Sequence, residues 1–188
     1  MSDVPLFPLN TVLFPGGRLP LRIFEQRYMD MAKACLKDGS AFGVCLIREG
    51  SEVGEPALPV DVGTLARITA WDMPQLGVLE VVAVGERRFR IKERRVESSG
   101  LARASIEALP EDEDGAIPAD CAGCVTLIER VIKEQPALFE PPLRKDSASW
   151  IGSRLAELLP VPLSAKQELL ELTDARARLQ ALNALLGR

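Results

Sequence analysis

The stretch VPLFPLNTVLFPGGRLPLRIFEQRY, residues 4–28, decides what kind of fold this chain adopts. Its prolines, at positions 5, 8, 15 and 20, exclude a helix, because each lacks a backbone donor and disfavours helix at the residue before it. The residues between the prolines are too apolar for a solvated loop. The stretch therefore predicts short extended segments that cross a core, with turns between them, as in a β-rich domain.

Further strand patterns follow this opening. They are apolar or alternating runs, separated by turns, at residues 41–47, 62–71, 76–84, 87–96 and 101–109. Many short strands without helices between them predict an antiparallel barrel or sandwich. One helix is expected before these strands, at residues 25–37, where apolar side chains recur at helical spacing.

The pattern changes after residue 110. Residues 111–118 are acidic and flanked by proline, which predicts a solvated linker. All apolar periodicity in 119–188 is helical, with prolines as stop signals. We therefore expect an α+β protein with a β-barrel lobe at 1–110, a linker at 111–118 and a helical-bundle lobe at 119–188.

Composition excludes several classes of protein. The net charge of −4 gives no overall attraction to nucleic acid or to an anionic membrane. No apolar run approaches the ~18 residues of a membrane helix, and no signal peptide is recognisable, so a cytoplasmic protein with reduced cysteines is expected. The chain contains no histidine, which excludes a Ser-His-Asp triad and an HExxH zinc site. We predict no catalytic residue, no metal and no cofactor.

Several segments resemble the substrate-binding N-terminal domain of Lon proteases, in the same order. They are LFPLNTVLFPGGRLPLRIFEQRY (6–28), FGVCLI (42–47), VGTLARI (62–68), GERRFRI (85–91) and LAELLPVPLSAKQELLEL (155–172). The first and last of these segments are specific, and the middle ones are supportive. A frequent pattern of that family has histidine before IFE, where this chain has Arg22, so no role of that histidine carries over.

The resemblance implies a PUA-like antiparallel β-barrel followed by a C-terminal helical bundle. It also implies a bacterial-type cytoplasmic protein that recognises unfolded or specific polypeptides in protein quality control. A full Lon protease continues into ATPase and protease domains, whereas this chain ends at Arg188 and has no GxxxxGK[ST] loop. The expectation is a stand-alone, non-catalytic substrate-binding domain. Nothing in the sequence indicates its oligomeric state or whether it cooperates with a protease.

The segment between two predicted strands, WDMPQLG at 71–77, is the candidate contact surface for polypeptides. Trp71, Met73, Pro74 and Leu76 are unusual residues for a turn, and Trp and Met are favoured in adaptable binding surfaces. We interpret this hairpin tip as an apolar contact for an unfolded segment. The alternative is that Trp71 folds back onto the helical lobe.

A basic strand supports a second hypothesis, an RNA-binding module. Strand alternation would place Arg88, Arg90, Lys92 and Arg94 on one outward face, where they could follow a phosphate backbone. The same stripe could be a solvated strand edge, or could pair with the acidic linker. Aromatic residues are 5% of the chain and the net charge is negative, so nucleic acid is the less favoured partner.

Two further groups resemble functional sites. Cys121 and Cys124 form a CxxC pair, which could be a redox dithiol or half of a zinc site. We favour small buried residues at a helix start, because no second ligand pair of suitable spacing is present. Glu25, Arg27 and Tyr28 lie on a predicted first helical turn, which favours a structural role.

Overall fold

The computed structural model describes residues 2–112, 115–139 and 141–187. The chain divides into two compact units, Met1–Leu109 and Pro110–Arg188, which are described separately below. No helix in the described ranges is both long enough and apolar enough to cross a membrane.

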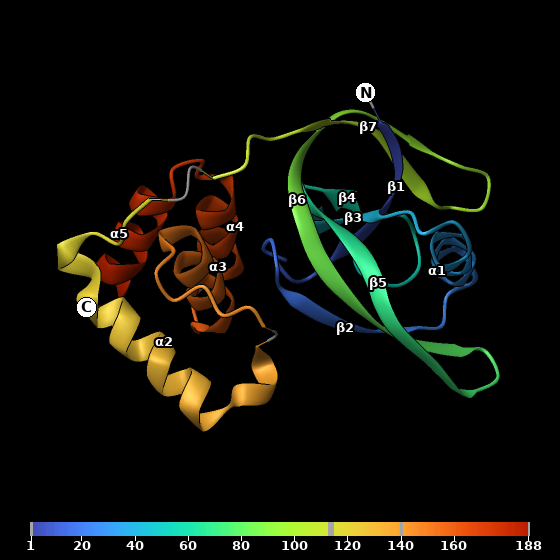
Figure 1. Ribbon diagram of the computed structural model, residues 1–188. Coiled ribbons are helices and arrows are strands. Elements are labelled where there is room, and N and C mark those ends of the chain that lie inside the picture. Colours follow the sequence, from blue (N-terminus) through green and yellow to red (C-terminus); the bar gives the residue numbers. More distant parts are fainter. Residues whose placement is uncertain (1, 113–114, 140, 188) are drawn as a thin grey trace. The chain divides into compact units, whose positions relative to one another are not determined.

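The first unit contains one helix and all strands of the described ranges (Figure 1). In chain order its elements are β1 (Ser2–Leu9), β2 (Arg18–Ile23), α1 (Gln26–Asp38), β3 (Phe42–Glu49), β4 (Leu58–Pro59), β5 (Val62–Gln75), β6 (Val78–Val96) and β7 (Ala102–Ala108). Helix α1 ends at Gly39, which adopts the left-handed conformation with φ +69°.

The strands close into a barrel. The sheet order is β1-β7-β6-β5-β3, and β3 pairs back onto β1, so no edge remains between the first and last of these strands. The barrel is antiparallel as predicted except for this closing pair: β1 and β3 run parallel, with Leu6 opposite Gly43 and Leu9 opposite Leu46. The parallel arrangement is available because β2 and α1 form the long crossover that two parallel strands require.

Strand β6 pairs with three other strands of the barrel, β2, β5 and β7. Two strands were expected at 76–84 and 87–96, but residues 78–96 form one strand of 19 residues. Its first half pairs with β2, its second half pairs with β7, and β5 follows it along the other side. The strand passes Gly85, where an added Cβ would collide with the carbonyl oxygen of Phe14. Glycine therefore serves here as a point of close backbone approach and not as a break.

The main core lies between the barrel and α1. Phe7 of β1 stacks on Tyr28 of α1 with 4.0 Å between ring centroids, and Phe42 lies 6.2 Å from Phe7. A second cluster lies around Phe89, which is fully buried between β3, β5 and β7 residues such as Ala104. The proline-rich opening segment supplies residues to both clusters, as expected of a segment that crosses the core.

The second unit is helical (Figure 1). Its elements are η1 (Ala119–Cys121), α2 (Ala122–Glu134), η2 (Pro136–Leu138), α3 (Ala148–Leu158), α4 (Leu163–Glu171) and α5 (Ala175–Leu186). The side chains of Ser147 and Asp174 cap α3 and α5 by accepting backbone N–H bonds. Helix α4 begins at Leu163, directly after Pro162, and has no side-chain cap at its N-terminus.

A buried ion pair fixes the start of this unit. Arg178 of α5 is 1% exposed and donates from both terminal nitrogens to the carboxylate of Asp112, which also accepts from the Ser149 hydroxyl at 2.7 Å. The same guanidinium donates to the carbonyl oxygens of Leu169 and Leu172. The expectation of a solvated linker is therefore wrong at Asp112, while residues 113 and 114 of that linker lie outside the described ranges.

Candidate functional site

The β5–β6 hairpin extends past the closed part of the barrel (Figure 1). Strand β3 pairs with β5 only as far as Ala66, so the later residues of β5 pair with β6 alone. The turn consists of Leu76 and Gly77, and Gly77 takes the left-handed conformation with φ +83°, as a type II turn requires at this position. The predicted contact residues therefore lie on the free end of a two-stranded ribbon.

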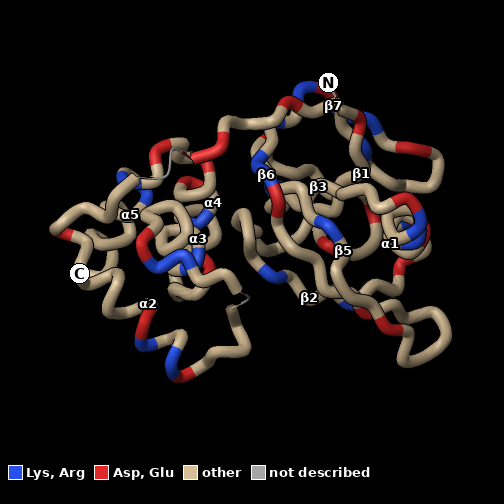
Figure 2. The backbone as a smooth tube through the Cα atoms, in the orientation of Figure 1, with Lys and Arg blue, Asp and Glu red and all other residues tan. Residues whose placement is uncertain are grey.

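The end of this ribbon is apolar and exposed. Trp71 is 60% exposed, Met73 41% and Leu76 97%, and Pro74 is exposed beside them. No charged residue occurs between Asp72 and Glu80, so the ribbon end is uncharged (Figure 2). We call Trp71, Met73, Pro74 and Leu76 the hairpin tip.

A groove of about 440 Å³ adjoins the hairpin tip. Its floor is the three-stranded sheet β2–β6–β5, in which Pro20, Val82 and Ala70 are cross-strand neighbours. The next row across the same sheet is Arg22, Glu80 and Asp72. Sequence reasoning missed this groove because β2 and β6 are about 60 residues apart and nothing local indicates that they pair.

A second hollow of about 300 Å³ lies on the other side of β2. Its apolar lining includes Leu9, Leu21, Phe24 and Val53. Phe24 is 57% exposed and Val53 is 55% exposed, so this hollow also presents apolar side chains to solvent. The β2 strand thus runs between two partly apolar hollows.

Arg27, near the start of α1, links this helix to the loops that contain Gly54 and Gly100. Its guanidinium is buried, donates to the carbonyl oxygens of Gly54 at 2.7 Å and Gly100 at 3.1 Å, and pairs with Glu25 at 3.0 Å. It also lies 4.7 Å from the centre of the Tyr28 ring, and burial raises the pKa of that tyrosine. These contacts join the start of α1 to two loops, which is the structural role expected for Glu25, Arg27 and Tyr28.

The prediction that Arg88 lies on an exposed basic face of β6 is wrong. This residue is 4% exposed and lies opposite Thr64, which is fully buried and donates to the carbonyl oxygen of Leu13 at 2.6 Å. Directly opposite residues share a face of the sheet. The apolar segment around Leu13 therefore covers the face on which Arg88 was expected to meet solvent.

A bulge interrupts the stripe farther along β6. Ile91 lies opposite Ile106 and Glu93 lies opposite Ser105, so Lys92 is the extra residue. This insertion changes which residues share the outward face: Arg90 is followed there by Glu93 rather than by a continuous row of cations. The expectation that all four basic residues share one face is wrong for this reason.

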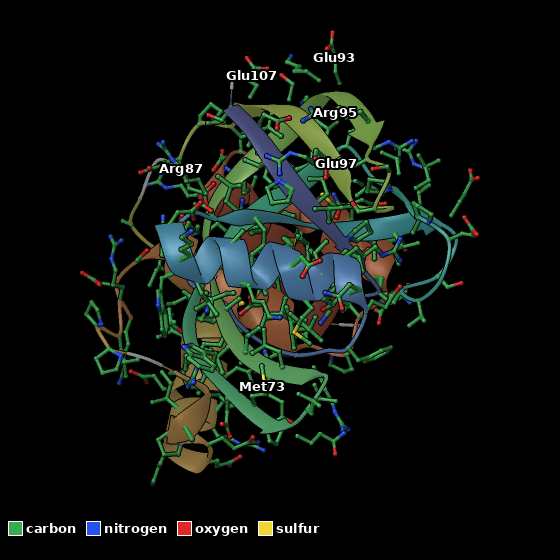
Figure 3. All side chains as sticks on the ribbon, turned by 90° about the vertical axis from the view of Figure 1, so that its right-hand side faces the viewer. Met73, Arg87, Glu93, Arg95, Glu97 and Glu107 are labelled. Carbon is green, nitrogen blue, oxygen red and sulfur yellow. The ribbon has the colours of Figure 1, made fainter. Side chains whose placement is uncertain are left out.

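Glu107 lies beside two of the remaining cations, opposite Arg90 and paired with Lys92. Lys92 pairs with Glu107 at 2.6 Å and lowers the pKa of that glutamate. Arg94 is exposed. The next residue, Arg95, pairs with Asp3. Figure 3 shows Glu93, Arg95 and Glu107 at the end of the barrel away from Met73. This end of the barrel carries mixed charge rather than a basic patch.

The CxxC pair is buried. Cys121 and Cys124 are both fully covered, and burial raises the pKa of both thiols, that of Cys124 to about 11. A raised pKa keeps them protonated at neutral pH, which opposes thiolate chemistry. No group of three or more Cys, Asp or Glu side chains with metal-binding geometry occurs in the described part of the chain.

Comparison with known proteins gives a consistent result. Residues 3–188 match the family model described as the ATP-dependent protease La (LON) substrate-binding domain. The Lon protease of Anaeromyxobacter dehalogenans is 29% identical over 98% of this chain, which corresponds to 23% of that protein. The chain thus spans about a quarter of the length of the curated relatives it matches. The cereblon protein of Gallus gallus is 30% identical over 57% of the chain.

Solved structures show the same architecture. The crystal structure of a Lon N-terminal domain protein from Xanthomonas campestris superposes with a TM-score of 0.82 and 36% identity, covering 98% of each chain. The N-terminal domain of the Mycobacterium avium complex Lon protease superposes with a TM-score of 0.71 at 20% identity, covering 96% of each chain. The α+β fold, a mainly antiparallel barrel followed by helices, is confirmed.

Proposed function

Because this chain belongs to the family of LON substrate-binding domains, we propose that it binds polypeptide segments with exposed apolar side chains, and that the hairpin tip is the contact surface. The family assignment supports a substrate-binding role in general. The finer assignment rests on the exposed tip formed by Trp71, Met73, Pro74 and Leu76.

The proposal rests on the exposure of three large apolar side chains at this tip, those of Trp71, Met73 and Leu76. Burial of a large apolar side chain contributes roughly 1.5–3 kcal/mol, so solvent exposure of several on one ribbon is unfavourable in the free protein. A partner that covers Trp71 and Leu76 recovers this free energy. Unfolded polypeptide is the partner with suitable chemistry, since it presents the apolar residues that folded proteins conceal.

We place this role in protein quality control in the cytoplasm. The four cysteines, all free and buried, support a reducing compartment. We propose that residues 1–188 bind polypeptide without cleaving it, because the family model that they match describes a substrate-binding domain. We assign no RNA-binding role to β6, because Arg88 is buried and Glu107 lies opposite Arg90 and pairs with Lys92.

The test compares binding of unfolded and folded forms of one protein. The probe is fluorescein-labelled α-lactalbumin, reduced and alkylated with iodoacetamide, with native α-lactalbumin as the negative control. Fluorescence anisotropy should show binding of the unfolded form only. The Trp71→Ser, Leu76→Ser double variant should bind at least about tenfold more weakly, since two central apolar contacts are lost.

The matched control is Leu138→Ser, which removes an exposed leucine from the helical unit. It should bind the unfolded probe as the unchanged protein does. Equal affinity of the double variant and the unchanged protein would contradict the assignment of the tip. Failure of the unchanged protein to bind the unfolded probe would contradict polypeptide binding itself.

A further inference from the structure

Strand β2 is an edge strand within an otherwise closed barrel. It pairs with β6 along residues 18–23, and no described strand pairs with its other side. Figure 1 shows β2 in the lower part of the barrel, where it meets β6. The register has no irregularity, so the free edge is a regular strand edge.

The pairing pattern determines which backbone groups face this free edge. Gly85 donates its N–H to the carbonyl oxygen of Gly17 at 2.9 Å, and Gly17 precedes β2 in the same register. In an antiparallel pair every second residue bonds to the partner strand. The odd-numbered residues of β2 therefore bond to β6, and Pro20 and Arg22 direct their backbone groups outward.

Pro20 agrees with this assignment, because proline has no N–H and is tolerated where that position faces away from the partner strand. The outward groups are the carbonyl oxygen of Pro20 and both the N–H and the carbonyl oxygen of Arg22. None of these groups has a hydrogen-bond partner among the described residues. Their two-residue spacing is that of a strand that accepts another extended chain.

The apolar hollow between β2 and β1 lies beside this edge. Leu21, Phe24 and Val53 border it, and Phe24 and Val53 are more than half exposed. An added strand directs alternate side chains to one face, where the hollow offers about 300 Å³. The hollow therefore provides space for the apolar side chains of an extended segment.

Charge around the edge favours a basic segment. Four carboxylates line the two hollows that border β2. That of Glu25 is paired with Arg27 at 3.0 Å, and those of Glu52, Asp72 and Glu80 form no ion pair within the described ranges. Arg22 is the one cation that lines them, and it forms no ion pair within the described ranges. This excess of negative charge complements lysine or arginine residues beside the apolar ones.

The other free edge in this region is less suitable. The end of β5 contains two register irregularities and Pro74, and the Asp72 carboxylate accepts the N–H of Met73 at 2.8 Å. Irregular register, proline and an occupied N–H all oppose strand pairing. The regular edge of β2 has Pro20 alone among these features.

We propose that an extended, basic and apolar polypeptide segment binds as an added strand on the free edge of β2, with hydrogen bonds to Arg22 and Pro20. This inference rests on the proposed function and specifies its binding mode and its substrate class. The hairpin tip then contacts an adjoining part of the same polypeptide. Backbone hydrogen bonds supply affinity without a defined sequence, and the hollow and the carboxylates supply the preference.

The probes are two fluorescein-labelled peptides with the same core, Lys-Lys-Val-Thr-Val-Thr-Val-Lys and Glu-Glu-Val-Thr-Val-Thr-Val-Glu. Anisotropy titrations at low and moderate salt should show tighter binding of the lysine peptide by about tenfold or more, with a smaller difference as salt rises. Equal affinity of the two peptides would contradict the charge preference.

The decisive variants are Arg22→Pro and Arg22→Ala. Both remove the guanidinium, but only Arg22→Pro removes the outward N–H. Arg22→Pro should bind the lysine peptide roughly three- to tenfold more weakly than Arg22→Ala, as expected for one lost backbone hydrogen bond. Thermal unfolding checks that both variants fold. Amide exchange of the unchanged protein is an independent readout, and the Arg22 N–H should exchange more slowly in the peptide complex than in the free protein.

The outcomes separate the two proposals. Equal peptide binding by Arg22→Pro and Arg22→Ala, together with unchanged exchange at Arg22, overturns strand addition. If strand addition is overturned but the Trp71→Ser, Leu76→Ser variant still binds unfolded α-lactalbumin more weakly than the unchanged protein, the proposed function stands with a different binding mode. If the unchanged protein binds neither peptide nor unfolded α-lactalbumin, both proposals are overturned.

Discussion

Asp3 is a single residue that joins three strands. Its carboxylate in β1 accepts from Arg95 of β6 at 2.5 and 2.9 Å and from Arg103 of β7 at 2.8 Å. These hydrogen bonds, first those from Arg95 and then those from Arg103, lower its pKa to about 2. The ionised form is therefore the one that stabilises this end of the barrel.

The stability effect of Asp3 should depend on pH in a defined direction. Its folded pKa lies below the ordinary value of 3.8, so its contribution is complete above about pH 4 and disappears as pH falls through about 2. Asp3→Asn should lower the free energy of unfolding at pH 7 by up to about 1 kcal/mol, because the site is exposed to solvent. Urea unfolding at pH 7, 4 and 2 measures this difference.

High salt provides the control for this prediction. In 0.5 M NaCl the difference between Asp3→Asn and the unchanged protein should shrink, since exposed ion pairs are screened. A difference that persists unchanged from pH 7 to pH 2 would show that the effect comes from packing and not from the carboxylate charge.

At the scale of single elements, strands β3 and β5 both pack closely against the ring of Phe89. Phe89 of β6 is fully buried, and an added Cβ at Gly63 of β5 would lie 2.9 Å from its ring and collide with the carbonyl oxygen of Val44. An added Cβ at Gly43 of β3 would lie 2.7 Å from the same ring. Glycine at both positions lets β3 and β5 pack beside the aromatic ring.

Gly63→Ala should therefore destabilise the barrel by roughly 1–3 kcal/mol, because backbone and ring must shift to accept one methyl group. The matched control is Gly123→Ala in α2, where the nearest heavy atom would lie 4.0 Å away. That helical substitution should be neutral or stabilise by up to about 1 kcal/mol. Urea midpoints of the two variants should move in opposite directions, and parallel shifts would contradict this account.

Local patterns in the sequence predicted most elements of the fold. Proline spacing and apolar alternation located the strands, and α1 lies within one residue of the expected 25–37. An exposed apolar turn was predicted because Trp71 and Leu76 are unusual turn residues, and both are exposed. Features that depend on distant pairing were not predicted: the parallel β1–β3 pair, the groove beside β2, and the cover over Arg88 supplied by the segment around Leu13.

At the scale of the whole molecule, the ion pair between Asp112 and Arg178 bears on which fragments of the helical unit can fold. We propose that residues 1–110 and 111–188 fold independently, whereas 119–188 does not. The shorter fragment lacks Asp112 and leaves Arg178 buried without its carboxylate, which costs about 3–5 kcal/mol. Circular dichroism with thermal unfolding should show a cooperative transition for 111–188 and a much lower or absent one for 119–188.

Two controls accompany the fragments. Arg178→Met in 119–188 should recover part of the lost stability, because it removes the buried charge. The fragment 1–110 should bind the lysine peptide as the full chain does, because Arg22, Pro20 and the hairpin tip all belong to it. Independent folding of 119–188 would contradict the role assigned to Asp112.

The position of β1 has a consequence for synthesis of the chain. Ser2 pairs with Ile106, so the barrel strand that is synthesised before the others completes its hydrogen bonds only with the last strand of the barrel. Contacts of such long sequence separation slow folding, since a large loop must close before they form. Until residue 106 emerges, one edge of β1 is without its partner strand β7, and a nascent chain in that state itself presents the kind of apolar extended segment that the finished domain is proposed to bind.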